Sequence, residues 1–159
     1  MKKILALILA LTATSAFADV SGGVTLASDY FFRGVSQTQG DTAIQWSLEA
    51  EKKGVYGGTW GSQVDFGGDA SIEYDFYSGY RWANDAVGLD VGVIQYNYNN
   101  QIDSVEEWYG VLAYKMVSFG YWRDMDNKDL DYKQVDIALP FIKYADVSLR
   151  YGEVGDSQY

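Results

Sequence analysis

The chain has no cysteine, no histidine and only one proline among its 159 residues. Without cysteine an exported protein has no disulfide framework, and without cysteine or histidine it lacks most zinc sites, thiol nucleophiles and Ser-His-Asp triads. Basic residues are also scarce, since 12 Lys and Arg face 22 Asp and Glu and leave a net charge of −10. So acidic a chain does not bind nucleic acid through a basic patch. We therefore expect no enzyme activity, no cofactor and no metal centre.

Long apolar runs are missing too, because after residue 18 none approaches the ~20 residues that a membrane-spanning helix requires. The start of the chain, by contrast, has the three parts of an export signal. A short basic stretch is followed by apolar residues 4–11 and by an A-x-A cleavage site that ends at Ala18. We predict that residues 1–18 form a cleaved signal peptide, that the protein is exported, and that residues 19–159 form a single domain.

What the sequence has instead is alternation with a period of two, clearest over residues 71–82, S-I-E-Y-D-F-Y-S-G-Y-R-W. Tyr74 and Phe76 fall on one face and Glu73 and Asp75 on the other, and this period predicts a β-strand. At about 12 residues the strand is longer than the usual soluble strand and about as long as a tilted strand that crosses a bilayer. An apolar face opposite a charged face suits a barrel with lipid outside and water inside.

Similar signals recur roughly every 10–15 residues between turn-forming residues, as in all-β barrels and sandwiches. The predicted strands cover residues 23–33, 42–51, 55–66, 71–82, 87–98, 106–115, 116–123, 135–139 and 144–151. Lys52, Lys53 and Gly54 predict a tight hairpin turn, and a break in the alternation at Ile94 predicts a β-bulge. We predict an all-β fold, an antiparallel up-and-down transmembrane β-barrel of about 8–10 strands. Because bacterial barrels have an even number of strands, an odd number implies a missing closing strand at the C-terminus or a miscount by one.

Charged residues are expected to gather on the inner face of the predicted barrel. The candidates are Glu49, Asp65, Glu73, Asp75, Arg81, Asp90 and Arg150. Paired carboxylates such as Glu73 and Asp75 can act as acid and base or hold a hard cation such as calcium. The alternative is that they line a wet lumen, pair with the basic groups and set an ion preference, because polar-in alternation alone produces such clusters.

Aromatic residues form a second group of candidates. We expect an aromatic girdle at the lipid headgroups, made by Trp46, Trp60, Tyr74, Tyr80, Trp82, Trp108 and Tyr121. The same rings could instead form a carbohydrate-binding platform or the core of a soluble sandwich. These alternatives differ in where the rings point, since rings packed together in the centre of the protein would indicate a soluble carrier.

Residues 28–38 read S-D-Y-F-F-R-G-V-S-Q-T, and here the chain resembles the TorF family of proposed outer-membrane porins, first known as the Gcw_chp domain. The motif positions are Ser28, Asp29, Tyr30, Phe32, Arg33, Gly34, Ser36, Gln37 and Thr38. Further elements resemble the family at residues 54–66 (G-x-x-x-G-T-W-x-S-x-V-D-F), 71–80 (S-x-E-x-D-x-Y-x-G-Y) and 91–96 (V-G-V-I-x-Y). The resemblance implies an outer-membrane barrel and brings no catalytic residues.

Pattern and resemblance together predict a bacterial outer-membrane β-barrel that acts as a porin or narrow channel for small solutes or ions, without catalysis. Its expected partners are outer-membrane lipid and small solutes or cations. Because a barrel of about eight strands is just filled by its own side chains, a narrow or plugged channel fits better than a wide pore. The rivals are a soluble periplasmic, lipocalin-like barrel that binds an apolar ligand, and an outer-membrane enzyme that uses Asp or Glu with Ser.

Overall fold

The computed structural model describes residues 18–100, 103–140 and 147–155. Apart from Ala18, the predicted signal peptide therefore lies outside the described residues, as does the start of the last predicted strand. Within the described ranges, no helix has the length and apolar character needed to cross a membrane.

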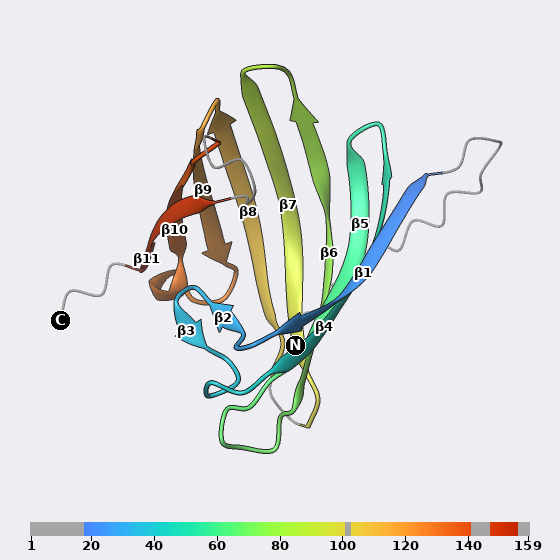
Figure 1. Cartoon of the computed structure of the whole chain (residues 1–159), viewed down its shortest axis with the longest axis vertical. Helices are drawn as coiled ribbons and strands as arrows, with labels where there is room; N and C mark the ends of the chain where they lie inside the picture. The colour runs from blue at the N-terminus through green and yellow to red at the C-terminus, as the bar shows by residue number, and fades with distance from the viewer. Residues whose placement is uncertain (1–17, 101–102, 141–146, 156–159) are drawn as a thin grey trace.

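One nine-stranded antiparallel sheet dominates the fold, and each of its strands pairs with the next along the chain (Figure 1). Its strands are β1 (Asp19–Ala27), β4 (Ala43–Lys52), β5 (Val55–Gln63), β6 (Ile72–Ala83), β7 (Val87–Tyr98), β8 (Val105–Tyr114), β9 (Val117–Asp124), β10 (Tyr132–Ala138) and β11 (Ser148–Val154). A separate hairpin and a short 3₁₀ turn accompany it, namely β2 (Phe31–Phe32), β3 (Val35–Ser36) and η1 (Lys128–Leu130). The predicted all-β antiparallel architecture is confirmed. Barrel closure is not, because β1 and β11 do not pair with each other in the described part of the chain.

The two ends of the sheet differ in the length of their connections. At the short-turn end, turns of two or three residues join β4 to β5, β6 to β7 and β8 to β9, while a nine-residue connection, 139–147, joins β10 to β11. The loop end carries the longer connections 28–42, 64–71, 99–104 and 125–131. Lys53 and Gly54 form the predicted hairpin turn, with positive φ values of 53° and 85° that suit a type I′ turn. Both β1 and β11 run from the short-turn end to the loop end, so direct pairing between them would be parallel.

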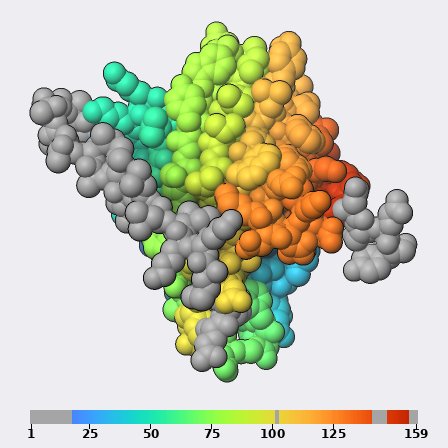
Figure 2. Space-filling view, turned by 180° about the vertical axis from the view of Figure 1, so that it is seen from behind, coloured from blue at the N-terminus to red at the C-terminus, as the bar shows by residue number. Residues whose placement is uncertain are grey.

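The sheet curls so that the β2–β3 hairpin lies against its concave face (Figure 1). Because successive side chains alternate between the faces of a strand, the strand register assigns each residue to the concave or the convex face. One convex row runs from Trp82 through Leu89 and Leu112 to Phe119, and all four side chains are exposed. Seen from behind, β6 to β9 lie side by side as one continuous surface (Figure 2). Large apolar side chains thus cover the outside of the sheet.

Glycines on the concave face make room for tyrosines from a neighbouring strand. Tyr56 of β5 lies against Gly79 of β6, and Tyr109 of β8 lies against Gly92 of β7, so that a Cβ at either glycine would overlap the tyrosine. The Tyr56 hydroxyl donates to Asp90 and is also hydrogen-bonded to the Tyr109 hydroxyl. Small residues beside large ones fill the taper of narrow barrel interiors in the same way.

Three predicted strands, 55–66, 135–139 and 144–151, have shifted ends in the structure, and two further differences have an identifiable cause. The predicted strand 23–33 ends at Ala27, because the chain then folds back across the concave face. The β-bulge predicted at Ile94 is wrong, since β7 pairs with both neighbours in unbroken register. The alternation changes there for another reason: the inner face turns from small and polar residues to Ile94 and Tyr96, which lie where the β2–β3 hairpin packs.

We expect Gly79→Ala to destabilise the folded protein, because the added methyl group has no space between the Tyr56 hydroxyl and the Val91 carbonyl oxygen. Overpacking of this kind costs about 1–3 kcal/mol. Gly23→Ala is the matched control, since nothing lies within 4 Å of a methyl group at that position. Urea unfolding of both variants in detergent, followed by tryptophan fluorescence, measures the difference in stability. Equal midpoints for the two variants would contradict the packing described.

Candidate functional site

Residues 28–38 form a segment that enters the concave side of the sheet from the loop end (Figure 1), and we call this segment the plug. Phe32 pairs with Val35, so Arg33 and Gly34 are the two residues of the β2–β3 turn. Their φ values of 49° and 86° are both positive, as a type I′ turn requires. Glycine adopts positive φ values freely whereas arginine does not. The unfavourable backbone conformation at Arg33 must therefore be offset by contacts of its side chain. The plug coincides with the motif of the family resemblance.

The Arg33 side chain makes these contacts with residues of β8 and β10. Its guanidinium donates to both carboxylate oxygens of Glu107 on β8, at 2.8 and 2.6 Å. The rings of Phe32 and Tyr132 lie over the guanidinium at 4.6 and 4.5 Å, and the Tyr96 hydroxyl donates to Glu107 at 3.0 Å. Glu107 is buried and Arg33 is largely so. A planar guanidinium can bind a carboxylate through two hydrogen bonds and stack on rings at once, which lysine cannot.

The plug is also braced within itself. The Asp29 carboxylate accepts hydrogen bonds from Ser36 Oγ at 2.7 Å and Thr38 Oγ1 at 2.8 Å. The hydrogen bond from Ser36, aided by that from Thr38, lowers the pKa of Asp29 below its ordinary value. The Asp65 N–H donates to the Gln37 carbonyl at 2.7 Å and ties the plug to the loop between β5 and β6. Asp65, predicted to face the lumen, therefore lies exposed in a loop instead.

The strand register places the other predicted lumen residues on the concave face, namely Glu49, Glu73, Asp75, Arg81, Asp90 and Arg150. Arg81 donates to Glu49 at 2.9 Å and lies over the Tyr56 ring at 3.9 Å. Arg150 pairs with Asp136 at 2.7 Å. In the described ranges, no group of three or more acidic, Cys or His residues is placed to hold a metal ion.

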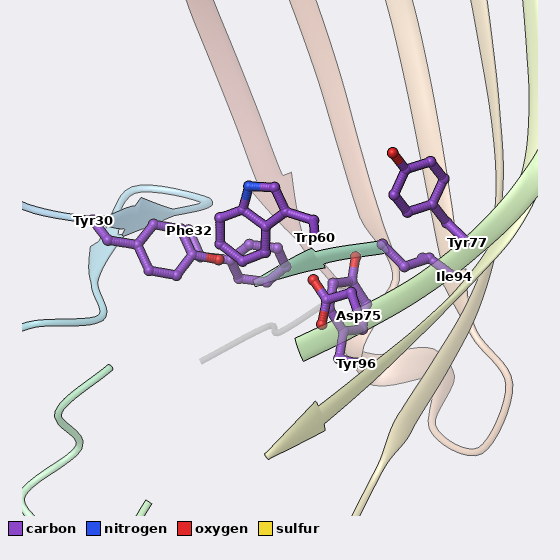
Figure 3. A pocket seen from close by; sticks show the side chains of 7 residues that line it. All are labelled: Tyr30, Phe32, Trp60, Asp75, Tyr77, Ile94 and Tyr96. Atoms are coloured by element: carbon purple, nitrogen blue, oxygen red, sulfur yellow. The ribbon is translucent and has the colours of Figure 1, made fainter. Parts of the chain in front are cut away.

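An aromatic pocket of about 300 Å³ opens on the concave face beside the plug (Figure 3). Its lining consists of Tyr30, Phe32, Trp60, Asp75, Tyr77, Ile94 and Tyr96. Trp60, Asp75 and Tyr96 are direct neighbours on β5, β6 and β7. Tyr30 packs on Trp60 with ring centroids 5.2 Å apart, and Phe32 packs on Tyr96 with centroids 5.5 Å apart. The sheet therefore forms the wall of the pocket and the plug covers it.

The residues predicted for the aromatic girdle divide between the two faces. The convex face carries Trp46, Tyr74, Tyr80, Trp82, Trp108 and Tyr121. Trp60 differs, because it points into the pocket (Figure 3), and its predicted outward orientation is wrong. The strand β5 reads V-Y-G-G-T-W-G-S-Q, with glycines near Trp60 on both of its faces. Its two faces therefore differ little in polarity, and the sequence does not show to which face the Trp60 ring belongs.

Sequence reasoning missed Glu107, the partner of Arg33, and the paired tyrosines Tyr56 and Tyr109. A signal was present for Glu107, because it directly precedes the convex residue Trp108, and alternation then places its carboxylate inside. For the tyrosines there was no such signal. A tyrosine ring suits a headgroup belt as well as a polar interior, so its identity alone does not reveal the face.

We expect Arg33→Met and Glu107→Gln each to destabilise the protein by roughly 3–5 kcal/mol, because each leaves a buried partner without its counter-charge. The double substitution should cost less than the sum, since neither charge is then left alone. Val35→Ala, on the same hairpin but exposed, is the control and should cost little. Urea unfolding of these variants in detergent gives the coupling energy. Strict additivity of the two single effects would rule out the ion pair as the anchor of the plug.

Of three comparisons with known proteins, one identifies a family and two find no match. Neither a curated protein nor a solved structure matches the chain. The model of a family described as a bacterial protein of unknown function (Gcw_chp) matches residues 10–155, a range that includes the plug, the pocket and every strand of the described sheet. Because this match spans nearly the whole chain, the protein belongs to the Gcw_chp family of bacterial proteins of unknown function.

Proposed function

We propose that the protein is a transmembrane β-barrel of the bacterial outer membrane and that its own plug obstructs the lumen. The path that remains serves small solutes or ions, in line with the porin function implied by the TorF resemblance, and no catalysis takes place. The observation that carries this proposal is the distribution of charge over the two faces of the sheet.

Charged side chains of the described strands are segregated by face. The concave face carries Asp19, Glu49, Glu51, Glu73, Asp75, Arg81, Asp90, Glu107, Asp124, Asp136 and Arg150. The convex face carries Lys52, Glu106, Arg123, Lys133 and Glu153, each within the first or last two positions of its strand. The middle of the convex face is thus free of charge. Because a cationic side chain at the bilayer midplane costs about 2–4 kcal/mol, lipid is the environment that fits this pattern.

Aromatic residues flank the uncharged band at both ends. Those toward the loop end are Trp46, Tyr74, Trp108 and Tyr121, and those toward the short-turn end are Tyr80, Trp82 and Tyr114. Two such belts are typical of membrane barrels, because rings that carry a polar atom suit the headgroup level. Short turns at one end, which here hold for three of its four connections, and longer loops at the other are typical as well. This asymmetry favours an orientation in which the loop end, and with it the entrance of the plug, faces the outside of the cell.

A barrel in lipid needs both sheet edges paired, since the bilayer offers no partners to backbone N–H and C=O groups. Because β1 and β11 run in the same direction, one strand running the opposite way would pair antiparallel with both. The proposal therefore includes such a closing strand. With it the barrel would have an even number of strands, as bacterial barrels do.

The lipocalin-like alternative fits the two faces less well. A soluble barrel buries its apolar side chains inside, whereas Val93 and Phe119 on the convex face are 45% and 50% exposed. The inner rings are not purely apolar either, since Tyr56 and Tyr96 use their hydroxyls to bind carboxylates. An apolar ligand would gain little from such an interior.

Val93→Lys places a charge in the middle of the uncharged band and should prevent folding into the membrane, with an expected cost of about 2–4 kcal/mol. Ser118→Lys, on the concave face opposite Asp136, is the control and should fold normally. Membrane fractionation combined with a heat-modifiability gel detects the folded barrel, which resists SDS until it is boiled. A soluble barrel would give the reverse result: the wild-type protein would appear in the periplasmic fraction and Val93→Lys would fold as well as wild type.

We expect the wild-type protein to show small or no conductance steps in planar bilayers, because the plug fills the lumen. Replacing residues 31–36 with a Gly-Ser stretch of equal length should give larger steps that prefer cations, since carboxylates outnumber arginines on the concave face. The same replacement at residues 125–130, in the loop between β9 and β10, is the control and should leave the steps small. Large, stable steps from the unaltered monomer would contradict an obstructed lumen.

A further inference from the structure

The pocket beside the plug contains a buried carboxylate with one oxygen that accepts no hydrogen bond. Asp75 is 3% exposed, and its Oδ1 accepts no hydrogen bond. Figure 3 shows the Asp75 carboxylate among the rings of Trp60 and Tyr96. Glu73, two residues away on the same face of β6, is 2% exposed, and its Oε2 is equally without a partner. The other oxygen of Glu73 accepts a hydrogen bond from the Tyr98 hydroxyl at 3.4 Å. Because an ionised carboxylate is costly to bury without full compensation, these two acids require either protons or a cation.

The arginines of the chain are already engaged with other carboxylates. They form the ion pairs Arg33–Glu107, Arg81–Glu49, Arg81–Glu51, Arg123–Asp131 and Arg150–Asp136. In the part of the chain that the structure describes, no ion pair includes Glu73 or Asp75. None of these pairs neutralises Glu73 or Asp75, and a cation from solution would supply that counter-charge.

The lining of the pocket indicates which kind of cation fits. A hard cation such as calcium takes six to eight oxygen ligands, but the pocket is lined by aromatic rings, Ile94 and a single carboxylate, with no metal-ligand cluster in the described residues. Rings of Tyr30, Phe32, Trp60 and Tyr96 meet around this space in two contacting pairs. Aromatic faces attract cations within about 6 Å of the ring centroid, and cages of such rings bind quaternary ammonium groups.

We propose that this pocket binds a small alkylated ammonium ion, with its positive charge beside Asp75 and its alkyl groups against the surrounding rings. Glu73 adds negative charge at longer range from the next concave position of β6. A neutral molecule of the same shape would fill the cavity but leave Asp75 without a counter-charge. In taking this ion as a solute of the lumen the inference rests on the proposed channel function, whereas binding itself requires only the folded pocket.

Isothermal titration calorimetry on the full-length protein, folded in detergent, tests the proposal with choline chloride as the probe. The neutral carbon analogue of choline, in which carbon replaces the nitrogen, is the matched ligand control, and sodium chloride holds the ionic strength constant. We expect choline to bind and the analogue to bind at least on the order of tenfold more weakly. Equal affinities for the two ligands, or no binding of choline up to about 10 mM, would overturn the proposal. The second result would leave protons as the partners of the two acids.

Two variants locate the site. Asp75→Asn and Trp60→Leu should each weaken choline binding on the order of tenfold or more, while Glu51→Gln, on the same face but near the short-turn end, should leave it unchanged. Unchanged binding by Asp75→Asn would place the ligand elsewhere and so refute this site. A heat-modifiability gel on every variant separates lost folding from lost binding. If the protein binds choline but fractionates as soluble, the channel proposal is refuted and the binding site stands. If it folds as a membrane barrel but does not bind choline, the binding site is refuted and the channel proposal stands.

Discussion

The bidentate ion pair between Arg33 and Glu107 is the interaction on which the interior depends. It connects the turn of the plug to β8, and the rings of Phe32 and Tyr132 enclose its guanidinium. Among the described residues, no other ion pair joins the plug to the sheet. Tyr30 is held over Trp60 by the plug itself, whose Gln37 N–H donates to the Tyr30 carbonyl at 2.7 Å while the Tyr30 N–H donates to Thr38 Oγ1 at 3.2 Å. The buried Arg33–Glu107 pair thus fixes the turn of the plug on the concave face of the sheet.

The two faces of the sheet carry side chains of opposite polarity. The convex face has exposed apolar residues and no charge in its middle, while the concave face combines carboxylates, arginines and tyrosine hydroxyls. In water the exposed apolar convex face would favour aggregation, since monomeric soluble proteins rarely expose large apolar patches. In lipid it would be the stabilising surface. The proposed membrane location therefore explains the outside of the sheet and the obstructed lumen explains the inside, and each can be tested without the other.

Alternation predicted the strands well wherever the two faces differ in polarity. Over β6 the contrast is sharp, and both the strand and its faces follow from the pattern. Over β5 it is weak, because glycines surround Trp60, and the ring was assigned to the wrong face. At Ile94 the change of phase reflects a change in what the concave face contacts, from small and polar neighbours to the packed plug, and a tertiary contact of that kind leaves no local signal. The first half of the plug, residues 28–33, was predicted as the end of a strand because its alternation continues that of β1, although Gly34 is a residue that permits a turn.

The pairs Tyr56–Gly79 and Tyr109–Gly92 have a consequence for how neighbouring strands choose their alignment. A mispairing by two residues keeps every side chain on its own face, so polarity alone does not oppose it. Such a shift would bring Tyr56 against Tyr77 or Arg81 and Tyr109 against Asp90 or Ile94, where the rings would have no room. Each tyrosine thus recognises one glycine on the adjoining strand and rejects the nearest alternatives. Steric complementarity between large and absent side chains supplies the alignment information that the hydrophobic pattern lacks.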